Sequence, residues 1–207
     1  MIKTNIVVLG GGVIGLATAL RMLNSGREVI LLDPEEPGSG TSYGNAGTIA
    51  EYAVLPIGSP DVLKKLPSLL FDKNSSILIK RSEVLSLMPW LLRFLYQSTP
   101  KQAAKNAKAI SELLSDSRHR WEVLANHIGA DSRLKSNGTL YFYQNKASYE
   151  AGKKDMNNRK LLGINVEMLS PTELGKLEPN LKNIRGGASF FPDGAYMNDP
   201  GEIMKLL

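Results

Sequence analysis

The sequence has no cysteine among its 207 residues and only two histidines. The lack of cysteine excludes disulfides, thiolate metal sites and cysteine nucleophiles. Neither His119 nor His127 has a second histidine or a carboxylate at ligand spacing, so we interpret both as structural or solvated residues and expect no metal. Long apolar runs are also lacking, since no uninterrupted stretch approaches the ~18 residues of a membrane span.

The charge balance is mildly basic, with a formal net charge of +5 and a pI near 9.3. Such a balance suits acidic substrates, nucleic acid or an anionic membrane surface equally well. No stripe of basic residues interleaved with aromatics is present, so nucleic acid, including a tRNA substrate, is the least favoured of these partners. With 43% hydrophobic residues the chain can form a sizeable core in one or two domains. We expect a cytoplasmic protein, with peripheral contact at the inner membrane as an alternative.

A glycine-rich stretch near the N-terminus lies between two segments of different periodicity. The apolar run 6–9 predicts a strand, and the helical spacing of apolar residues over 13–23 predicts a helix. In a dinucleotide-binding βαβ unit, Gly10, Gly12 and Gly15 allow a tight turn, backbone contact with a pyrophosphate and close packing of the helix on the strand. The phosphates then lie at the helix N-terminus, where unpaired N–H groups and the helix dipole favour negative charge.

An acidic residue follows the next predicted strand. The apolar run 29–32 ends at Asp33, about 20 residues past the glycines, where a carboxylate can accept hydrogen bonds from an adenosine ribose. The same carboxylate argues against a cofactor with a 2′-phosphate, because two negative groups would face each other. The sequence therefore predicts an adenine-dinucleotide site, and these residues alone leave a nicotinamide cofactor open.

The segment 34–47 is rich in proline, glycine and serine and predicts an irregular loop. Its second half, from Ser42 to Gly47, is a cluster of small residues that allow a backbone to lie flat against a ligand. Ser42 and Asn45 add hydroxyl and amide groups that can reach phosphate or sugar oxygens.

The combination of Gly10-x-Gly12-x-x-Gly15, Asp33 and Ser42-x-x-Asn45-Ala46-Gly47 resembles the D-amino-acid oxidase superfamily of FAD-dependent enzymes. Within it, the chain is most similar to the bacterial D-amino-acid dehydrogenases and related amine oxidoreductases. The resemblance implies FAD as the cofactor, with its ADP half on the first motif and Asp33, and its pyrophosphate, ribityl and flavin parts on the second. The cofactor-binding residues expected are Gly10, Gly12, Val13, Ile14, Gly15, Asp33, Pro34, Ser42, Asn45, Ala46 and Gly47.

Beyond the loop, the sequence predicts a mainly helical region followed by a mixed one. Prolines at intervals over 51–100 predict only short helices, and amphipathic spacing over 101–128 predicts one long helix that ends at Gly129. A capping box from Ser170 to Glu173 predicts a further helix start. Strands are predicted at 139–143, 165–169 and 187–191, and another helix at roughly 146–162.

One apolar patch, 89–96, carries the aromatic residues Trp90 and Phe94 beside Arg93. Such a patch is typical of a helix packed on the flavin domain, of a substrate-access lid or of an interfacial membrane anchor. The sequence leaves these three interpretations open.

These elements predict an α/β fold, α+β overall, with a Rossmann-like FAD-binding βαβ unit and part of a mixed-sheet substrate domain. The expected segments are an FAD-binding segment 1–50, a mainly helical region 51–136, part of a substrate-binding domain 137–197 and the start of a return to the FAD domain at 198–207. Because the chain stops early in an apolar helix and members of the resembled family are longer, we expect an N-terminal fragment or a truncated gene product. Its flavin-domain sheet should then show exposed edges or an open face.

The resemblance also implies a reaction, the oxidation of a D-amino acid or related amine at its Cα by hydride transfer to flavin N5, giving a 2-oxo acid and ammonia. The expected partners are a small-molecule amino-acid substrate and an electron acceptor, either a quinone or carrier protein or oxygen. The sequence does not identify the arginine expected at the substrate carboxylate, so it names no catalytic residue. The alternatives are an NAD-dependent dehydrogenase and an inactive truncated flavoprotein fragment, and we expect residues 1–207 alone to be inactive.

Overall fold

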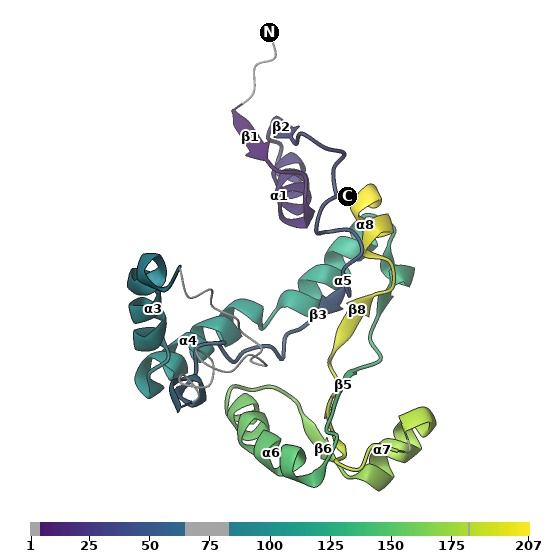
Figure 1. The fold of residues 1–207 in the computed structure, drawn as a ribbon. Coiled ribbons are helices and arrows are strands. Elements are labelled where there is room, and N and C mark those ends of the chain that lie inside the picture. The colour runs from purple at the N-terminus through teal and green to yellow at the C-terminus, as the bar shows by residue number, and fades with distance from the viewer. Residues whose placement is uncertain (1–4, 65–82, 182) are drawn as a thin grey trace. The chain divides into compact units, whose positions relative to one another are not determined.

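The structure is a computed structural model that describes residues 5–64, 83–181 and 183–207. The chain divides into two compact units. The first comprises the residues up to Ala50 together with Asp116–Leu140 and Phe190–Leu207, and the second comprises Glu51–Ser115 and Tyr141–Ser189. Both contain helices and strands, which confirms the mixed α/β class (Figure 1).

The first unit begins with the predicted strand–turn–helix–strand sequence. Strand β1 (Ile6–Leu9) is followed by helix α1 (Val13–Asn24) and strand β2 (Val29–Leu32). The two strands pair in parallel along their whole length, as a right-handed βαβ crossover requires. Because the side chains of a strand alternate between its faces, Ile6 and Val8 share one face of β1. That face packs against α1, since a Cβ added at Gly15 would lie 3.5 Å from Cγ1 of Val8.

The opposite face of this two-stranded sheet is open. Val7 and Leu9, which alternate with the residues facing α1, are 52% and 78% exposed. Leu32 at the end of β2 is also 52% exposed. The open sheet face expected from the sequence is therefore present.

The rest of the first unit is built on an antiparallel sheet that was not predicted in full. Strand β8 (Ala195–Met197) pairs with β3 (Thr48–Ile49) on one side and with β4 (Leu134–Lys135) on the other. Helices α5 (Ser117–His127) and α8 (Pro200–Leu206) and the short helix η2 (Asp131–Arg133) belong to the same unit. Its core includes Leu16, Ile49, Ala125, Ala195 and Ile203, with Leu16 connecting α1 to the other elements.

The second unit is mainly helical, with α3 (Val84–Gln97), α4 (Pro100–Leu114), α6 (Lys146–Leu161), α7 (Pro171–Leu177) and η3 (Pro179–Leu181). Strands β5 (Thr139–Phe142), β7 (Ala188–Phe191) and β6 (Glu167–Leu169) form a three-stranded sheet in the order β5-β7-β6, of which residues 141–142, 188–189 and all of β6 belong to this unit. The predicted capping box is confirmed at α7, where Glu173 N–H donates to the Ser170 hydroxyl and Ser170 N–H donates to the Glu173 carboxylate.

Two helix predictions are wrong. The predicted helix over 101–128 is two helices, because Ser115 and Asp116 interrupt it between α4 and α5. The Ser115 hydroxyl donates to the carbonyl of Glu112, a local bond that competes with helix propagation. Gly129, at a φ of +70°, does stop the second helix.

The prediction of only short helices before residue 100 fails at α3, which is 14 residues long with Pro89 inside it. Proline removes the bond that its N–H would donate to the carbonyl four residues earlier. That carbonyl belongs to Leu85, whose side chain is 84% exposed at the start of the helix. Water can therefore donate a hydrogen bond to the Leu85 carbonyl in place of the missing N–H. Residues 65–82 of the region expected to be helical lie outside the described residues.

Candidate functional site

The predicted glycine turn joins β1 to α1. Gly10 has a φ of +100°, a conformation that favours glycine, and its N–H donates to the carbonyl of Leu32 at 2.8 Å. Gly15 is required by close packing, because a Cβ there would lie 1.8 Å from the carbonyl oxygen of Gly10. The first and third glycines of the motif thus have the roles that the spacing predicts, a tight turn and a close approach of helix to strand.

The N-terminus of α1 presents backbone donors. Its N-cap is Gly12, which has no side chain to accept them. The N–H of Val13 donates to the Ser42 hydroxyl oxygen at 2.9 Å. Within the described part of the chain, no acceptor bonds the N–H groups of Ile14 and Gly15. Two donors at the positive end of a helix dipole are therefore available to an anion such as a phosphate.

The loop 33–47 is tied to the glycine turn by three hydrogen bonds. One is the bond from Val13 to Ser42. The second runs from Gly38 N–H to the carbonyl of Gly11 at 2.7 Å. The third runs from Gly11 N–H to Oδ2 of Asp33. The two motifs that the sequence suggested as parts of one site are therefore adjacent in the structure.

Asp33 lies directly beyond β2 and is exposed. The N–H groups of Gly11 and then Glu35 donate to its carboxylate and lower its pKa, because they stabilise the charged form. The carboxylate is thus ionised at neutral pH and turned toward the glycine turn. An exposed anion in this position can accept hydrogen bonds from the hydroxyls of a ribose.

Asn45 and Gly47 shape the loop itself. The Asn45 amide nitrogen donates to the carbonyls of Thr41 and Ser42, and its Oδ1 accepts from Gly47 N–H at 2.7 Å. Gly47 is buried beside β8, where a Cβ would lie 2.4 Å from the carbonyl oxygen of Met197. In the structure both residues contact the protein's own backbone, so they hold the loop in place beside the turn.

The remaining predicted site residues, Ile14, Pro34 and Ala46, are all exposed. Ile14 is 77% exposed at the first turn of α1, next to the available donors. Side chains of the described residues therefore leave this end of the helix open to a ligand.

Gly11 is a residue of the candidate site that the sequence prediction did not include. It is buried, it bonds both Asp33 and Gly38, and a Cβ there would lie 3.1 Å from Cα of Pro37. The signal was present, since Gly11 is the middle residue of three consecutive glycines. The dinucleotide motif specifies only the outer two of these positions, so it does not predict the contacts of Gly11.

Nowhere in the described part of the chain do three His, Asp or Glu side chains come together as a metal ion would require. Within the same ranges, every helix is too short or too polar for a membrane span. The chemistry of the site is that of backbone donors and one carboxylate, which fits the ADP half of a dinucleotide.

Comparison with known proteins agrees with this geometry. A family model described as "FAD dependent oxidoreductase" (DAO) matches residues 5–207. A D-amino-acid oxidase of Bradyrhizobium diazoefficiens is 28% identical over 206 residues, which are 98% of this chain and 49% of that relative. A D-amino acid dehydrogenase 2 of Ralstonia nicotianae is 31% identical over 193 residues, 91% of this chain and 45% of that relative.

A solved structure, glycine oxidase from Bacillus cereus, shares the fold with a TM-score of 0.59 at 18% identity, over 99% of this chain and 42% of that one. The chain therefore spans about half the length of the curated relatives it matches.

Proposed function

Since the chain belongs to the DAO family of FAD-dependent oxidoreductases, we propose that its glycine turn and the loop 33–47 bind the ADP and pyrophosphate parts of FAD. The observation that carries this proposal is the pair of available N–H groups, of Ile14 and Gly15, beside the ionised Asp33. The donors suit the pyrophosphate and the carboxylate suits the ribose. Ser42 ties the loop to α1, and Asn45 and Gly47 hold the backbone of the loop itself.

The reaction we propose for the whole protein is oxidation of a D-amino acid or a related amine at its Cα. FAD, when bound, supplies the acceptor of the hydride at its N5 position. Loss of that hydride and of a proton from nitrogen converts the amine to an imine, and water then gives a 2-oxo acid and ammonia. Relatives named D-amino-acid oxidase and D-amino acid dehydrogenase 2 support this substrate class. Oxygen, or a quinone or carrier protein, then takes up the electrons.

This chain's own residues contribute cofactor binding and orientation to that reaction. The tight turn at Gly10 and the close packing at Gly15 fix the direction of the α1 donors. No described residue is assigned to substrate binding or proton transfer. An NAD-dependent enzyme is not favoured, because the matching family uses FAD.

Cofactor binding is tested by adding FAD or NAD to the full chain and following FAD fluorescence and NAD affinity. We expect saturable FAD binding and none of NAD at matched concentrations. Tight NAD binding without FAD binding would reject the proposal. Gly15→Ala, which places a Cβ against the Gly10 carbonyl, should abolish FAD binding, whereas Gly175→Ala in α7 should not.

The reaction is tested on the protein expressed from its own gene. Its visible spectrum should show flavin, and anaerobic addition of D-alanine should bleach it, whereas L-alanine, glycine and sarcosine define the specificity. Flavin that no amine bleaches would favour the alternative of an inactive flavoprotein fragment. This outcome leaves the cofactor proposal intact and rejects the reaction.

We also propose a peripheral membrane contact at α3, whose side chains include none that is buried. Trp90 is 58% exposed and stacks on Phe94 with ring centroids 5.2 Å apart, and Leu85 is 84% exposed. Arg93 in α3 and Lys101 in the first turn of α4 add positive charge, which favours binding to anionic lipid.

The membrane contact is tested by sedimentation with vesicles of phosphatidylcholine and about 30% phosphatidylserine. We expect the full chain to sediment with these vesicles. Leu85→Ser together with Trp90→Ser should release it. Leu113→Ser, at an 81% exposed position in α4, is the matched control and should leave binding unchanged. Equal sedimentation of all variants would exclude α3 as the contact.

A further inference from the structure

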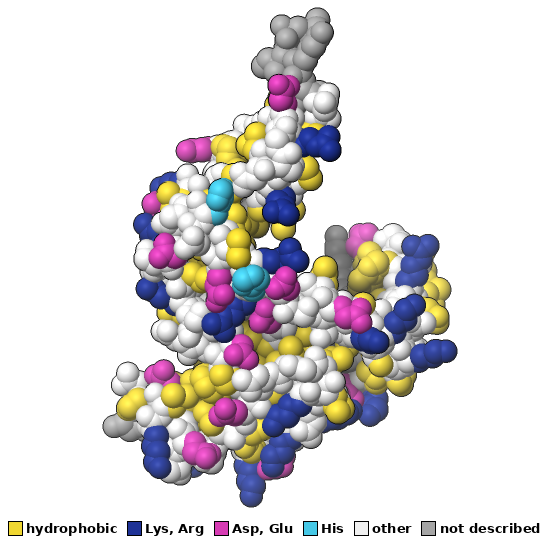
Figure 2. Space-filling model, turned by 180° about the vertical axis from the view of Figure 1, so that it is seen from behind, with side chains coloured by type: hydrophobic (Ala, Val, Ile, Leu, Met, Phe, Trp, Pro, Cys, Tyr) yellow, Lys and Arg dark blue, Asp and Glu magenta, His cyan; other side chains and the backbone are white. Residues whose placement is uncertain are grey.

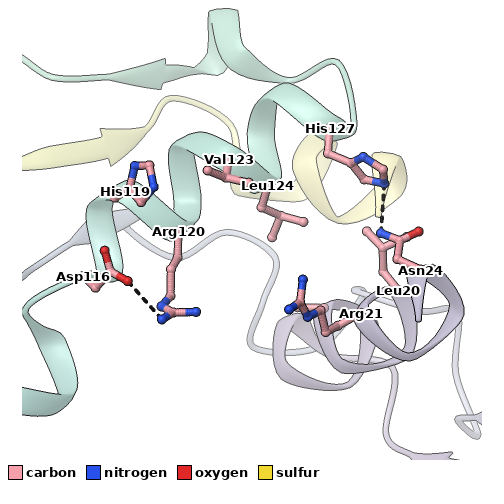
Figure 3. A pocket seen from close by; sticks show the side chains of 10 residues that line it. Leu20, Arg21, Asn24, Asp116, His119, Arg120, Val123, Leu124 and His127 are labelled. Atoms are coloured by element: carbon pink, nitrogen blue, oxygen red, sulfur yellow. Dashed lines mark hydrogen bonds and ion pairs between the residues drawn. The ribbon is translucent and has the colours of Figure 1, made fainter.

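A pocket of about 670 Å³ lies between α1 and α5 within the first unit (Figure 3). Its α1 side begins at Ala17 and ends at Asn24, so it does not include the glycine turn at the start of that helix. Its volume is in the range of pockets that hold small organic molecules. The cofactor proposal does not use this part of α1.

A hydrogen bond links the two helices at one end of the pocket. The amide nitrogen of Asn24 and Nε2 of His127 are hydrogen-bonded at 3.1 Å, near the C-terminal ends of α1 and α5. His119 also lines the pocket. Both histidine side chains, cyan in Figure 2, are visible on one face of the molecule.

The charges in the pocket are not balanced. Arg120 forms an ion pair with Asp116 at 3.0 Å, so these two side chains offset each other. Arg21 lines the same pocket, and among the described residues it has no carboxylate partner. Among the arginines and carboxylates that line the pocket, one positive charge is therefore uncompensated. Figure 3 shows the Arg21 guanidinium in the space between the two helices.

The rest of the lining is largely apolar. Leu20 comes from α1, and Val123 and Leu124 come from α5. Val123 is 56% exposed, so its side chain is accessible to a ligand in the pocket. A ligand in this pocket would thus meet one cation and an apolar wall.

We propose that this pocket binds a small organic monocarboxylate with an apolar body. A guanidinium matches a carboxylate through two parallel hydrogen bonds, and the single uncompensated charge suits a monoanion. The apolar body lies against Leu20 and Val123 and is removed from water. A phosphate dianion is less suited, because the pocket offers only one arginine that is not already paired with a carboxylate.

The probe for this site is hexanoate, compared with hexanol and hexylamine, which share its apolar chain but not its charge. Nuclear magnetic resonance titration of the full chain follows the ring signals of His119 and His127. We expect hexanoate to shift both signals saturably, hexanol to bind roughly tenfold more weakly and hexylamine to cause no saturable shift. Equal affinities for hexanoate and hexanol, or no saturable shift with hexanoate, would overturn the proposal.

Two pairs of variants locate the site. Arg21→Gln should weaken hexanoate binding roughly tenfold, whereas Arg27→Gln, an exposed arginine outside the pocket, should leave it unchanged. Val123→Asp places a second carboxylate in the pocket and should abolish binding, whereas Leu161→Asp, at an 85% exposed position in α6, should not. If a variant and its control lost hexanoate affinity equally, hexanoate would bind outside this pocket. FAD affinity is expected to be the same in all four variants, so this test and the cofactor test fail independently.

Discussion

The hydroxyl oxygen of Ser42 accepts a hydrogen bond at 2.9 Å from the N–H of Val13, the first residue of α1. In many helices the side chain of the N-cap residue accepts a hydrogen bond of this kind from an N–H group of the first turn. Here the N-cap is Gly12, and the absence of a side chain makes room for Ser42, because a Cβ at Gly12 would lie 3.2 Å from the Ser42 hydroxyl. Ser42, the first residue of the second motif, therefore caps helix α1, which begins within the glycine motif.

Ser42→Ala removes this cap. Ser42 is only 8% exposed, so Val13 N–H would lose its acceptor with little water to replace it. We expect the free energy of unfolding to fall by about 1 kcal/mol and FAD affinity to fall with it, measured by urea unfolding and FAD titration. Ser115→Ala, which removes an exposed hydroxyl bonded to Glu112, is the control and should change stability by less than about 0.5 kcal/mol. Identical unfolding midpoints for the two variants would contradict the capping role.

Gly15→Ala tests the packing of α1 on the turn. Its Cβ would lie 1.8 Å from the Gly10 carbonyl oxygen, so backbone must move. We expect a loss of roughly 2–3 kcal/mol in the free energy of unfolding, measured by urea unfolding. In Gly175→Ala the new Cβ meets nothing within 4 Å in helix α7, and stability should stay the same or rise by up to about 1 kcal/mol. A Gly15→Ala protein as stable as Gly175→Ala would show that the turn has room for a side chain.

The sequence predicted those parts of the fold that depend on neighbouring residues. The run 6–9, the helix after it and the run 29–32 form β1, α1 and β2 with nearly the expected bounds. The capping box at Ser170 is a local pattern of four residues, and the structure contains both of its bonds. In such cases turn chemistry and periodicity act within one element, and tertiary contacts do not override them.

Contacts between distant residues set the rest. Strands β3 and β4 are two residues each and exist only because β8, far along the chain, pairs with both. The role of Gly11 depends on Asp33 and Gly38, which the loop brings back to the turn. Only the family resemblance indicated that the two motifs are adjacent. The three hydrogen bonds between the loop 33–47 and the glycine turn join residues far apart in the sequence, so no local sequence pattern predicts them.

Ser170→Ala tests whether α7 depends on its cap. The substitution removes the acceptor of Glu173 N–H and one donor to the Glu173 carboxylate. We expect a loss of about 1 kcal/mol, with faster amide hydrogen exchange in the first turn of α7. Ser86→Ala removes a hydroxyl that bonds Glu83 in exposed α3 and should leave exchange in α7 unchanged. Equal exchange rates in the wild type and Ser170→Ala would show that packing alone holds the helix.

Asp33→Asn gives a prediction about pH. The N–H groups of Gly11 and Glu35 lower the pKa of Asp33 in the folded protein. A carboxylate with a lowered folded pKa contributes stability that is fully present above its ordinary pKa, and this contribution is lost as the pH falls through the lowered value. The asparagine variant lacks this contribution, so the difference in unfolding free energy from wild type should shrink below about pH 4 in urea titrations.

The control for Asp33→Asn is Glu173→Gln, because the Ser170 hydroxyl and N–H also lower the pKa of Glu173. Both variants should lose stability at neutral pH and approach wild type in acid, since the sign of the linkage is the same. Only Asp33→Asn should weaken FAD binding at neutral pH, because only Asp33 lies beside the glycine turn. If FAD affinity fell equally in both variants, the effect of Asp33 would be one of stability, and its carboxylate would have no role in holding the ribose.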